Sequence, residues 1–381
     1  MSKLIYLDNA ATTKTAPEVV EAMLPYFTEY YGNPSSVYSF AAQNKEVITQ
    51  QREIIANALG AKTEEIYFTA GGSESDNWAL KATAEAYGNK GKHIITTKIE
   101  HHAILHSAEY LEKRGYEVTY LDVDEYGVVK LDDLKAAIRP DTILISVMFA
   151  NNEIGTIQPI KEIGEIAHEH GILFHTDAVQ AFGQVPINVD ECHIDMLSAS
   201  GHKLNGPKGI GFLYIRKGVK LRSFVHGGAQ ERKRRAGTEN VPGIAGLGKA
   251  AELIYENHEE KIAHIREIKD HFIKRVMEEI PDVKDNSGDA PHVASISFLG
   301  VRSEVLLHAL EEREIYVSAG SACSSNKPEV SGTLKGIGLT KEYYESTLRF
   351  SFSIFNTVEE ADICVEALKE LLPMLRRFTR R

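Results

Sequence analysis

Short, continuous apolar segments alternate with segments of helical periodicity along the first two-thirds of the chain. The pattern predicts strands at 65–69, 93–97, 142–149, 172–176, 195–199 and 210–215. It also predicts helices that open near Gly71 and that cover 102–114 and 161–170. Because continuous β-branched runs between helices are typical of strands buried on both faces, we expect an α/β fold with a mostly parallel sheet.

The pattern changes in the last third of the chain. Apolar side chains recur over 258–280 at steps of three, four or a multiple, which predicts one face of a long amphipathic helix. Further elements are expected as strands at 293–298 and 348–352, and as helices at 303–313 and from about residue 358. This part therefore indicates a separate, smaller α+β domain that begins near residue 257.

The chain has 381 residues and a formal net charge of −11. The acidic balance argues against a broad nucleic-acid-binding face, because phosphate contacts need clustered positive charge. No apolar run reaches the ~18 residues of a membrane span, and the first eight residues are too polar for a signal peptide. We therefore expect a cytoplasmic protein of about two domains, with neither a membrane nor a nucleic acid as direct partner.

Three cysteines are present, Cys192, Cys323 and Cys364, at wide spacing and without a Cys-x-x-Cys motif. This excludes a disulfide scaffold and a self-contained zinc or iron–sulfur site, and it fits a reducing compartment. Cys192 and Cys364 lie in patterned stretches and are expected to be structural. Cys323 stands in a loop of serine, glycine and alanine that packs no core, which favours an exposed, reactive thiol.

A lysine follows a predicted buried strand in the segment 198–211, where the neighbouring residues are small. Lys203 has three interpretations: an ordinary glycine-rich turn, a phosphate-binding loop, or an amine that forms a Schiff base with an aldehyde cofactor. Gly201 and Gly206 have the spacing of a phosphate-binding loop, but Pro207 stands where that motif requires lysine. We reject the phosphate loop, and the other two interpretations stay open.

Asp177 falls where a predicted strand ends, which is the edge of a parallel sheet at which ligands bind. Capping a helix is the ordinary role of aspartate at such a position. Pyridoxal phosphate, however, needs a carboxylate against its ring nitrogen, so that the cationic ring withdraws electrons from the substrate. Asp177 followed by Lys203, each at the end of a strand, supplies both requirements of that cofactor.

Three further features have more than one interpretation. The turn at Gly72 and Ser73 is either a capping turn or an anion site at a helix N-terminus. His102 and His106 lie four residues apart and can face one metal ion, but no third ligand is evident, and ordinary or cofactor-stacking histidines remain alternatives. Arg349, among apolar strand residues, needs either an internal salt bridge or a substrate carboxylate.

Together these segments resemble the cysteine desulfurases, pyridoxal-phosphate enzymes of the NifS/IscS type. The matching segments, in collinear order, are 6–13, 32–36, 100–101, 151–155, 175–180, 200–203, 235–238, 320–323 and 349–351. The resemblance implies the PLP-dependent transferase fold of type I, with a mostly parallel seven-stranded sheet. It also implies a large cofactor domain at 13–257, and a small domain of 1–12 and 258–381 that carries the cysteine loop.

The resemblance assigns roles to the cofactor residues. Lys203 would hold pyridoxal phosphate and act as acid and base, Asp177 would pair with the ring nitrogen, and His101 would stack on the ring as a further catalytic group. Gln180 would donate to the phenolic oxygen. Further contacts to the cofactor are implied for Gly72, Ser73, Asn152, Ser200 and His202, and for Thr238 of the second subunit of a homodimer.

The remaining roles concern the substrate. Asn152 and Arg349 would bind the carboxylate of L-cysteine, and Cys323 would attack its sulfur, leaving L-alanine and a persulfide. The sulfur would pass to an iron–sulfur scaffold or a tRNA-thiolation enzyme, with no resident metal and with transient cluster ligation by Cys323 left open. Two alternatives stay open: another PLP-dependent lyase or aminotransferase (selenocysteine lyase-like, for example), and an iron–sulfur carrier that needs neither Asp177 nor Lys203.

Overall fold

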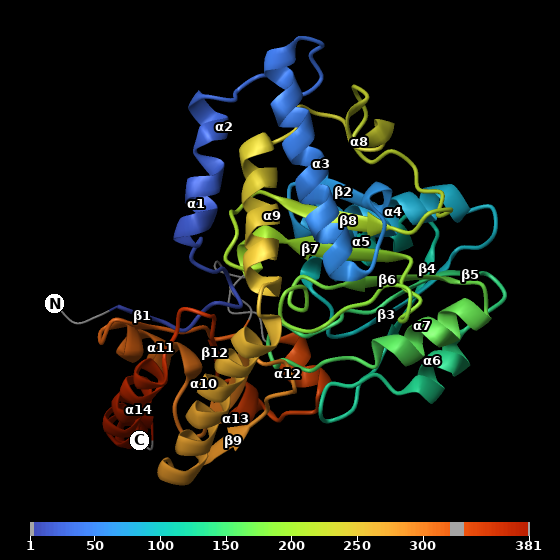
Figure 1. The fold of residues 1–381 in the computed structure, drawn as a ribbon. Helices are drawn as coiled ribbons and strands as arrows, with labels where there is room; N and C mark the ends of the chain where they lie inside the picture. Colours follow the sequence, from blue (N-terminus) through green and yellow to red (C-terminus); the bar gives the residue numbers. More distant parts are fainter. Residues whose placement is uncertain (1–3, 321–330, 380–381) are drawn as a thin grey trace.

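The computed structural model describes residues 4–320 and 331–379, and its centre is a seven-stranded sheet (Figure 1). The strands are β2 (Ile66–Thr69), β3 (His93–Thr97), β4 (Glu117–Leu121), β5 (Thr142–Ser146), β6 (Leu173–Asp177), β7 (Met196–Ser200) and β8 (Gly211–Ile215). Their order is β2-β8-β7-β6-β5-β3-β4, in which only β8 runs antiparallel to its neighbours. The predicted mostly parallel, seven-stranded sheet is confirmed.

Two details of this sheet differ from the prediction. Strand β4 was not expected, because it lies at an edge of the sheet and its side chains are mostly half-exposed, so it lacks a continuous apolar run. Strand β5 ends at Ser146, although the apolar run continues to Phe149. Val147 and Phe149 still donate to backbone carbonyls of β6, and both are buried. The apolar sequence therefore continues past the end of the strand because the chain stays buried there.

Helices cover both faces of the sheet (Figure 1). Helices α4 (Gly72–Tyr87) and α5 (His102–Glu112) share an apolar cluster with one face, while α3 (Ser39–Leu59), α7 (Ile160–Glu169) and α9 (Val241–Tyr255) pack on the other. Consecutive strand residues point to opposite faces, so Tyr67 joins the first cluster and Phe68 the second. Shorter helices in this part are α1 (Pro17–Met23), α2 (Pro25–Thr28), α6 (Leu131–Ala137), α8 (Gln230–Lys233), and the 3₁₀ turns η1 (Thr63–Glu65) and η2 (Gly201–Lys203).

The last third of the chain builds a second sheet, three-stranded and antiparallel, in the order β12 (Thr347–Ser351), β10 (Val293–Phe298), β9 (Val283–Asp285). Helices α10 (His258–Glu279), α11 (Ser303–Glu311) and α14 (Val358–Thr379) pack around it in a separate apolar cluster. The expected long helix at 258–280 is α10, amphipathic as predicted. The other helices here are α12 (Gly332–Gly336) and α13 (Lys341–Tyr344), and Leu334 of α12 packs against the core of the large sheet.

The N-terminal segment connects the two sheets. Strand β1 (Ile5–Tyr6) pairs with β11 (Ile315–Tyr316), and Ile5 and Leu7 belong to the apolar cluster of the last third. After β1, the side chain of Asn9 donates to the backbone oxygen of Ser351 at 2.8 Å. Thr13 then donates to the carbonyl of His202 at 2.8 Å, next to the large sheet. Within the two described ranges, no helix is long and apolar enough to cross a bilayer.

Candidate active site

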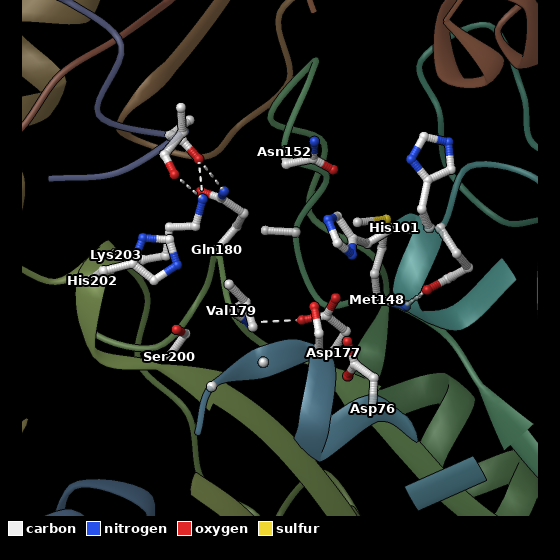
Figure 2. A pocket seen from close by; sticks show the side chains of 18 of the residues that line it. Asp76, His101, Met148, Asn152, Asp177, Val179, Gln180, Ser200, His202 and Lys203 are labelled. Atoms are coloured by element: carbon white, nitrogen blue, oxygen red, sulfur yellow. Dashed lines mark hydrogen bonds between the residues drawn. The ribbon is translucent and has the colours of Figure 1, made fainter. Parts of the chain in front are cut away.

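A cavity of about 680 Å³ lies at the carboxyl ends of β6 and β7 (Figure 2). It is lined by the N-terminal segment, the start of α4, the loop before α5, the chain after β5, and β12. Ten of the predicted site residues line it: Gly72, Ser73, His101, Asn152, Asp177, Gln180, Ser200, His202, Lys203 and Arg349. Thr238 lies elsewhere, exposed on the loop between α8 and α9, and Cys323 lies outside the described residues.

Lys203 occupies one side of the cavity. It ends the turn η2 directly after the buried strand β7, and the close approach of Gly206 to Gly201 folds the chain tightly there: a Cβ on Gly206 would lie 2.7 Å from the carbonyl of Gly201. The ammonium group donates to the backbone oxygens of Ala10 and Ala11, the latter at 2.7 Å. The N-terminal segment thus holds this amine at the cavity, in a place a substrate or cofactor carbonyl can reach.

Asp177 occupies the other side, across Val179 and Gln180 from the lysine (Figure 2). It ends β6, it is 5% exposed, and its Oδ1 accepts the backbone N–H of Val179 at 2.9 Å. Burial raises the pKa of this carboxyl, while His101 and Lys203 oppose the rise. A cationic partner above the carboxylate would relieve this desolvation, which is the environment a protonated ring nitrogen provides.

A second carboxyl, which the sequence analysis did not single out, lies beside Asp177. Asp76 of α4 is 1% exposed, and burial, reinforced by Asp177, raises its pKa well above the ordinary value. Asp76, Asp177 and His101 each place a ligand-type atom within 4.8 Å of the others. Two buried carboxyls this close disfavour each other's ionisation, and the rise in pKa is the larger for Asp76. Asp76 is four residues after Gly72 on one helix, and that spacing was the available signal.

His101 caps helix α5 with its side chain. Its Nδ1 accepts the backbone N–H of Ala103 at 3.1 Å, and burial lowers its pKa, so the ring is neutral with its proton on Nε2. The neighbouring pair His102 and His106 stacks with ring centroids 5.1 Å apart. In the described part of the chain this pair belongs to no cluster of three metal-ligand side chains, so the alternative of a zinc site there has no support.

The N-terminus of α4 opens onto the cavity. Gly72 approaches the chain just after β6 so closely that a Cβ there would lie 2.6 Å from Cγ2 of Val179. Ser73, Ser200 and His202 line the cavity around this terminus. His202 contacts the Thr12 hydroxyl through Nδ1 at 3.1 Å, and burial lowers its pKa to about 4, so it is neutral at pH 7. Helix N–H groups, hydroxyls and a neutral imidazole suit a phosphate dianion.

Arg349 approaches the cavity from β12. It is 2% exposed, its Nη2 pairs with Asp8 at 2.7 Å, and its Nη1 donates to the backbone oxygen of Asn152 at 2.8 Å. The two interpretations of this arginine therefore coexist, because it has an internal salt bridge and also lines the cavity. Asp8 was not expected, since it lies 341 residues away in sequence.

Three more buried polar residues support the site and had no predicted role. Glu100 accepts the backbone N–H of Met148 and the hydroxyl of Thr97, and burial raises its pKa to about 8. His175 lies between the hydroxyls of Ser146 and Ser198, at 2.9 and 3.0 Å, and burial lowers its pKa to about 3. The third is His292, which contacts Gln180 from the smaller sheet.

These residues fit pyridoxal phosphate. The glycine cradle at α4 suits the phosphate, the buried Asp177 needs a cation, and the amine of Lys203 lies on the same cavity. Val179 lies on one side of the cavity and His101 on the other, and the space between these two side chains has room for a flat ring (Figure 2). The arrangement therefore supports chemistry at the carbon next to an amine.

Comparison with known proteins gives consistent results. The model of the family described as aminotransferase class-V matches residues 5–364. The chain is 54% identical to the cysteine desulfurase IscS of Methanosarcina thermophila, with 99% of this chain and 94% of the relative covered. It is 51% identical to the cysteine desulfurase IscS of Clostridium botulinum (strain Hall), with 100% and 97% covered.

Solved structures show the same similarity in three dimensions. A NifS-like protein superposes with a TM-score of 0.92 at 36% identity, covering 98% of this chain and 100% of its own. A structure described as SspA in complex with cysteine superposes with a TM-score of 0.82 at 38% identity, covering 93% and 100%.

Proposed function

This chain belongs to the aminotransferase class-V family and, within it, to the cysteine desulfurases, and we propose that it removes sulfur from L-cysteine to give L-alanine. The observation that carries the proposal is one cavity lined by Lys203, Asp177 and Arg349, an amine, a buried carboxylate and a guanidinium. Pyridoxal phosphate, when bound there, supplies an electron sink for the substrate carbon.

The side chains divide the work. The Arg349 guanidinium binds the substrate carboxylate, with the Asn152 side chain beside it, and so orients the amino acid. Lys203 holds the cofactor and then moves the α-proton of the substrate at Nζ. Asp177 would hold the ring nitrogen of the cofactor in its protonated form, and the neutral His101 would lie against the ring with its Nε2 proton available.

The sulfur transfer itself needs a second thiol, which we assign to Cys323. Its thiolate attacks the sulfur of the substrate, so an S–S bond forms as the C–S bond breaks. The electron pair stays on the substrate carbon, which takes a proton and leaves as L-alanine. The enzyme keeps a persulfide, and the step needs no external oxidant.

We propose in addition a cytoplasmic homodimer that hands sulfur to a scaffold for iron–sulfur clusters or to a tRNA-thiolation enzyme. The dimer is supported by exposed large apolar side chains near the N-terminus: Leu24, Phe27, Tyr31, Val37 and Tyr38. The exposed position of Thr238, away from its own cavity, suits a contact to a partner's cofactor phosphate. The cytoplasm is the compartment that keeps a catalytic thiol reduced.

We also propose that the chain divides into a cofactor domain at 13–257 and a small domain of 1–12 and 258–381. The proposal is supported by the apolar cluster that Ile5 and Leu7 form with α10, α11 and α14.

The decisive test is Cys323→Ser, with Cys192→Ser as the matched control. We expect the first variant to lose sulfide release from cysteine by about 10³-fold and to form no persulfide, while it keeps its cofactor absorption. Cys192 is half-buried and its pKa is raised by burial, so the control should behave as wild type. Wild-type sulfide release by Cys323→Ser would point to another lyase or aminotransferase, and a colourless protein to an iron–sulfur carrier.

A further inference from the structure

His292 is a buried histidine that joins the smaller sheet to the cavity. It precedes β10, it is 4% exposed, and its Nε2 lies 2.9 Å from Oε1 of Gln180. The amide nitrogen of Gln180 in turn donates to the backbone oxygen of Ala10 at 2.9 Å, the same carbonyl that accepts the Lys203 ammonium. His292 does not line the cavity itself, so it acts only through Gln180.

The hydrogen bonds determine where the protons lie. The oxygen of Ala10 is a backbone carbonyl and only accepts, so the side of the Gln180 amide that faces it must be the NH₂ group. The other side is then the amide oxygen, which also only accepts, so His292 must present an N–H at Nε2. The opposite assignment would place two acceptors against each other at 2.9 Å.

The second ring nitrogen of His292 has a different environment. Nδ1 is buried and has no hydrogen-bond partner in the described part of the chain. Burial, together with the positive charges of Lys269, Lys203 and Arg349, lowers the pKa of this histidine to about 3. A neutral ring has one proton, and with that proton on Nε2 the orphaned Nδ1 is bare.

We propose that His292 is a positioning residue: its Nε2–H fixes the amide of Gln180 so that the NH₂ group faces the cavity side. One hydrogen of this group is used on Ala10, and the second has no acceptor among the described residues, in a side chain that lines the cavity. Because the inference rests on the proposed function, the second hydrogen is assigned to an oxygen of the bound cofactor. Without the donor at 292, the amide oxygen of Gln180 loses its partner among the described residues, and the bond to Ala10 alone restrains the amide.

The tautomer is tested first, in apoprotein labelled with ¹⁵N at histidine. We expect two-bond ¹H–¹⁵N correlations to show a protonated Nε2 and a bare Nδ1 for His292, unchanged between pH 6 and pH 8. A proton on Nδ1, or titration of the ring in this range, would overturn the inference. This result does not depend on activity or on any variant.

The second test compares His292→Gln, whose amide nitrogen can replace Nε2, with His292→Leu, which has no donor. Cofactor affinity of the apoenzyme is measured by pyridoxal phosphate titration, and the absorption of the bound cofactor is followed against pH. We expect His292→Leu to bind about 10-fold more weakly and to shift the pH midpoint of the absorption change, and His292→Gln to stay near wild type. Ser295→Ala, a buried position on the strand β10 that follows His292, is the control for packing.

The outcomes separate the two proposals. Equal behaviour of His292→Gln and His292→Leu, or a wild-type affinity and midpoint in His292→Leu, would contradict the positioning role. A chain that binds pyridoxal phosphate with the expected variant pattern, but releases no sulfur from cysteine, would overturn the proposed function and leave the role of His292 intact.

Discussion

The two sides of the cavity are built on different principles. On the side of the large sheet, Asp177 and Asp76 are buried and His101 is half-buried, and desolvation moves the pKa of all three. On the opposite side, Lys203 and Arg349 each have direct partners from the N-terminal segment. The side of the large sheet determines the ionisation states of its groups, whereas the other side determines where the amine and the guanidinium lie. Substitutions on the two sides should therefore change different properties of the protein.

Loss of the amine should have the largest effect. We expect Lys203→Ala to abolish covalent attachment of the cofactor and to lower sulfide release by about 10⁴-fold, since both the tether and the proton carrier are gone. Attachment is measured by mass spectrometry after reduction with borohydride. Lys208→Ala, also on the cavity wall, serves as the control, and a cofactor still attached in Lys203→Ala would contradict the assignment.

Arg349→Lys should have the next largest effect. Lysine keeps the charge but loses the fork that reaches Asp8 and the Asn152 carbonyl together, so substrate orientation suffers. We expect kcat/KM for cysteine to fall by about 10²-fold to 10³-fold, with cofactor absorption retained. Arg302→Lys, at an exposed position, is the control. An unchanged kcat/KM would mean that the pair with Asp8 is purely structural.

On the side of the large sheet, the raised pKa of Glu100 can be tested through the pH dependence of the free energy of unfolding. Its pKa is raised from about 4.5 to about 8, so between these values the unfolded chain loses this proton before the folded one does, and stability falls as pH rises. Glu100→Gln removes the titration but leaves an extra N–H to satisfy. We therefore expect it to be about 2 kcal/mol more stable than wild type at pH 9, with the advantage lost near pH 5, by urea unfolding. A constant difference across pH would show that Glu100 ionises normally.

Gly72→Ala should have the smallest effect. The new Cβ would meet Val179 at 2.6 Å and push it toward the ring position, so we expect pyridoxal phosphate to bind about 10-fold more weakly. The double variant Gly72→Ala, Val179→Ala should recover most of the affinity, because it removes the atom that clashes. If the second substitution did not restore binding, the weaker affinity of Gly72→Ala would come from a change at the helix N-terminus and not from the contact with Val179.

The sequence predicted the parts of the site that lie where a pattern changes. Asp177 and Lys203 each follow a buried strand, and the topology of a parallel sheet brings such positions to one edge. Asp76 and Glu100 were missed because ordinary polar residues on a helix or in a loop show no sign of burial until the surrounding elements are placed. The pairing of Arg349 with Asp8 depends on register between two distant segments, which no local pattern encodes.

The stretch from Asp8 to Ala11 is synthesised at the outset but is held by Ser351, near the end of the chain. During translation the large sheet can fold while this stretch still lacks its contacts to β12, because β12 has not left the ribosome. A chain that lacks β12 therefore has the lysine and the aspartate of the pocket, but it lacks Arg349 and the contacts of Ser351 that hold the stretch from Asp8 to Ala11. The reaction at this pocket therefore depends on the last third of the chain as well as on the cofactor-binding half.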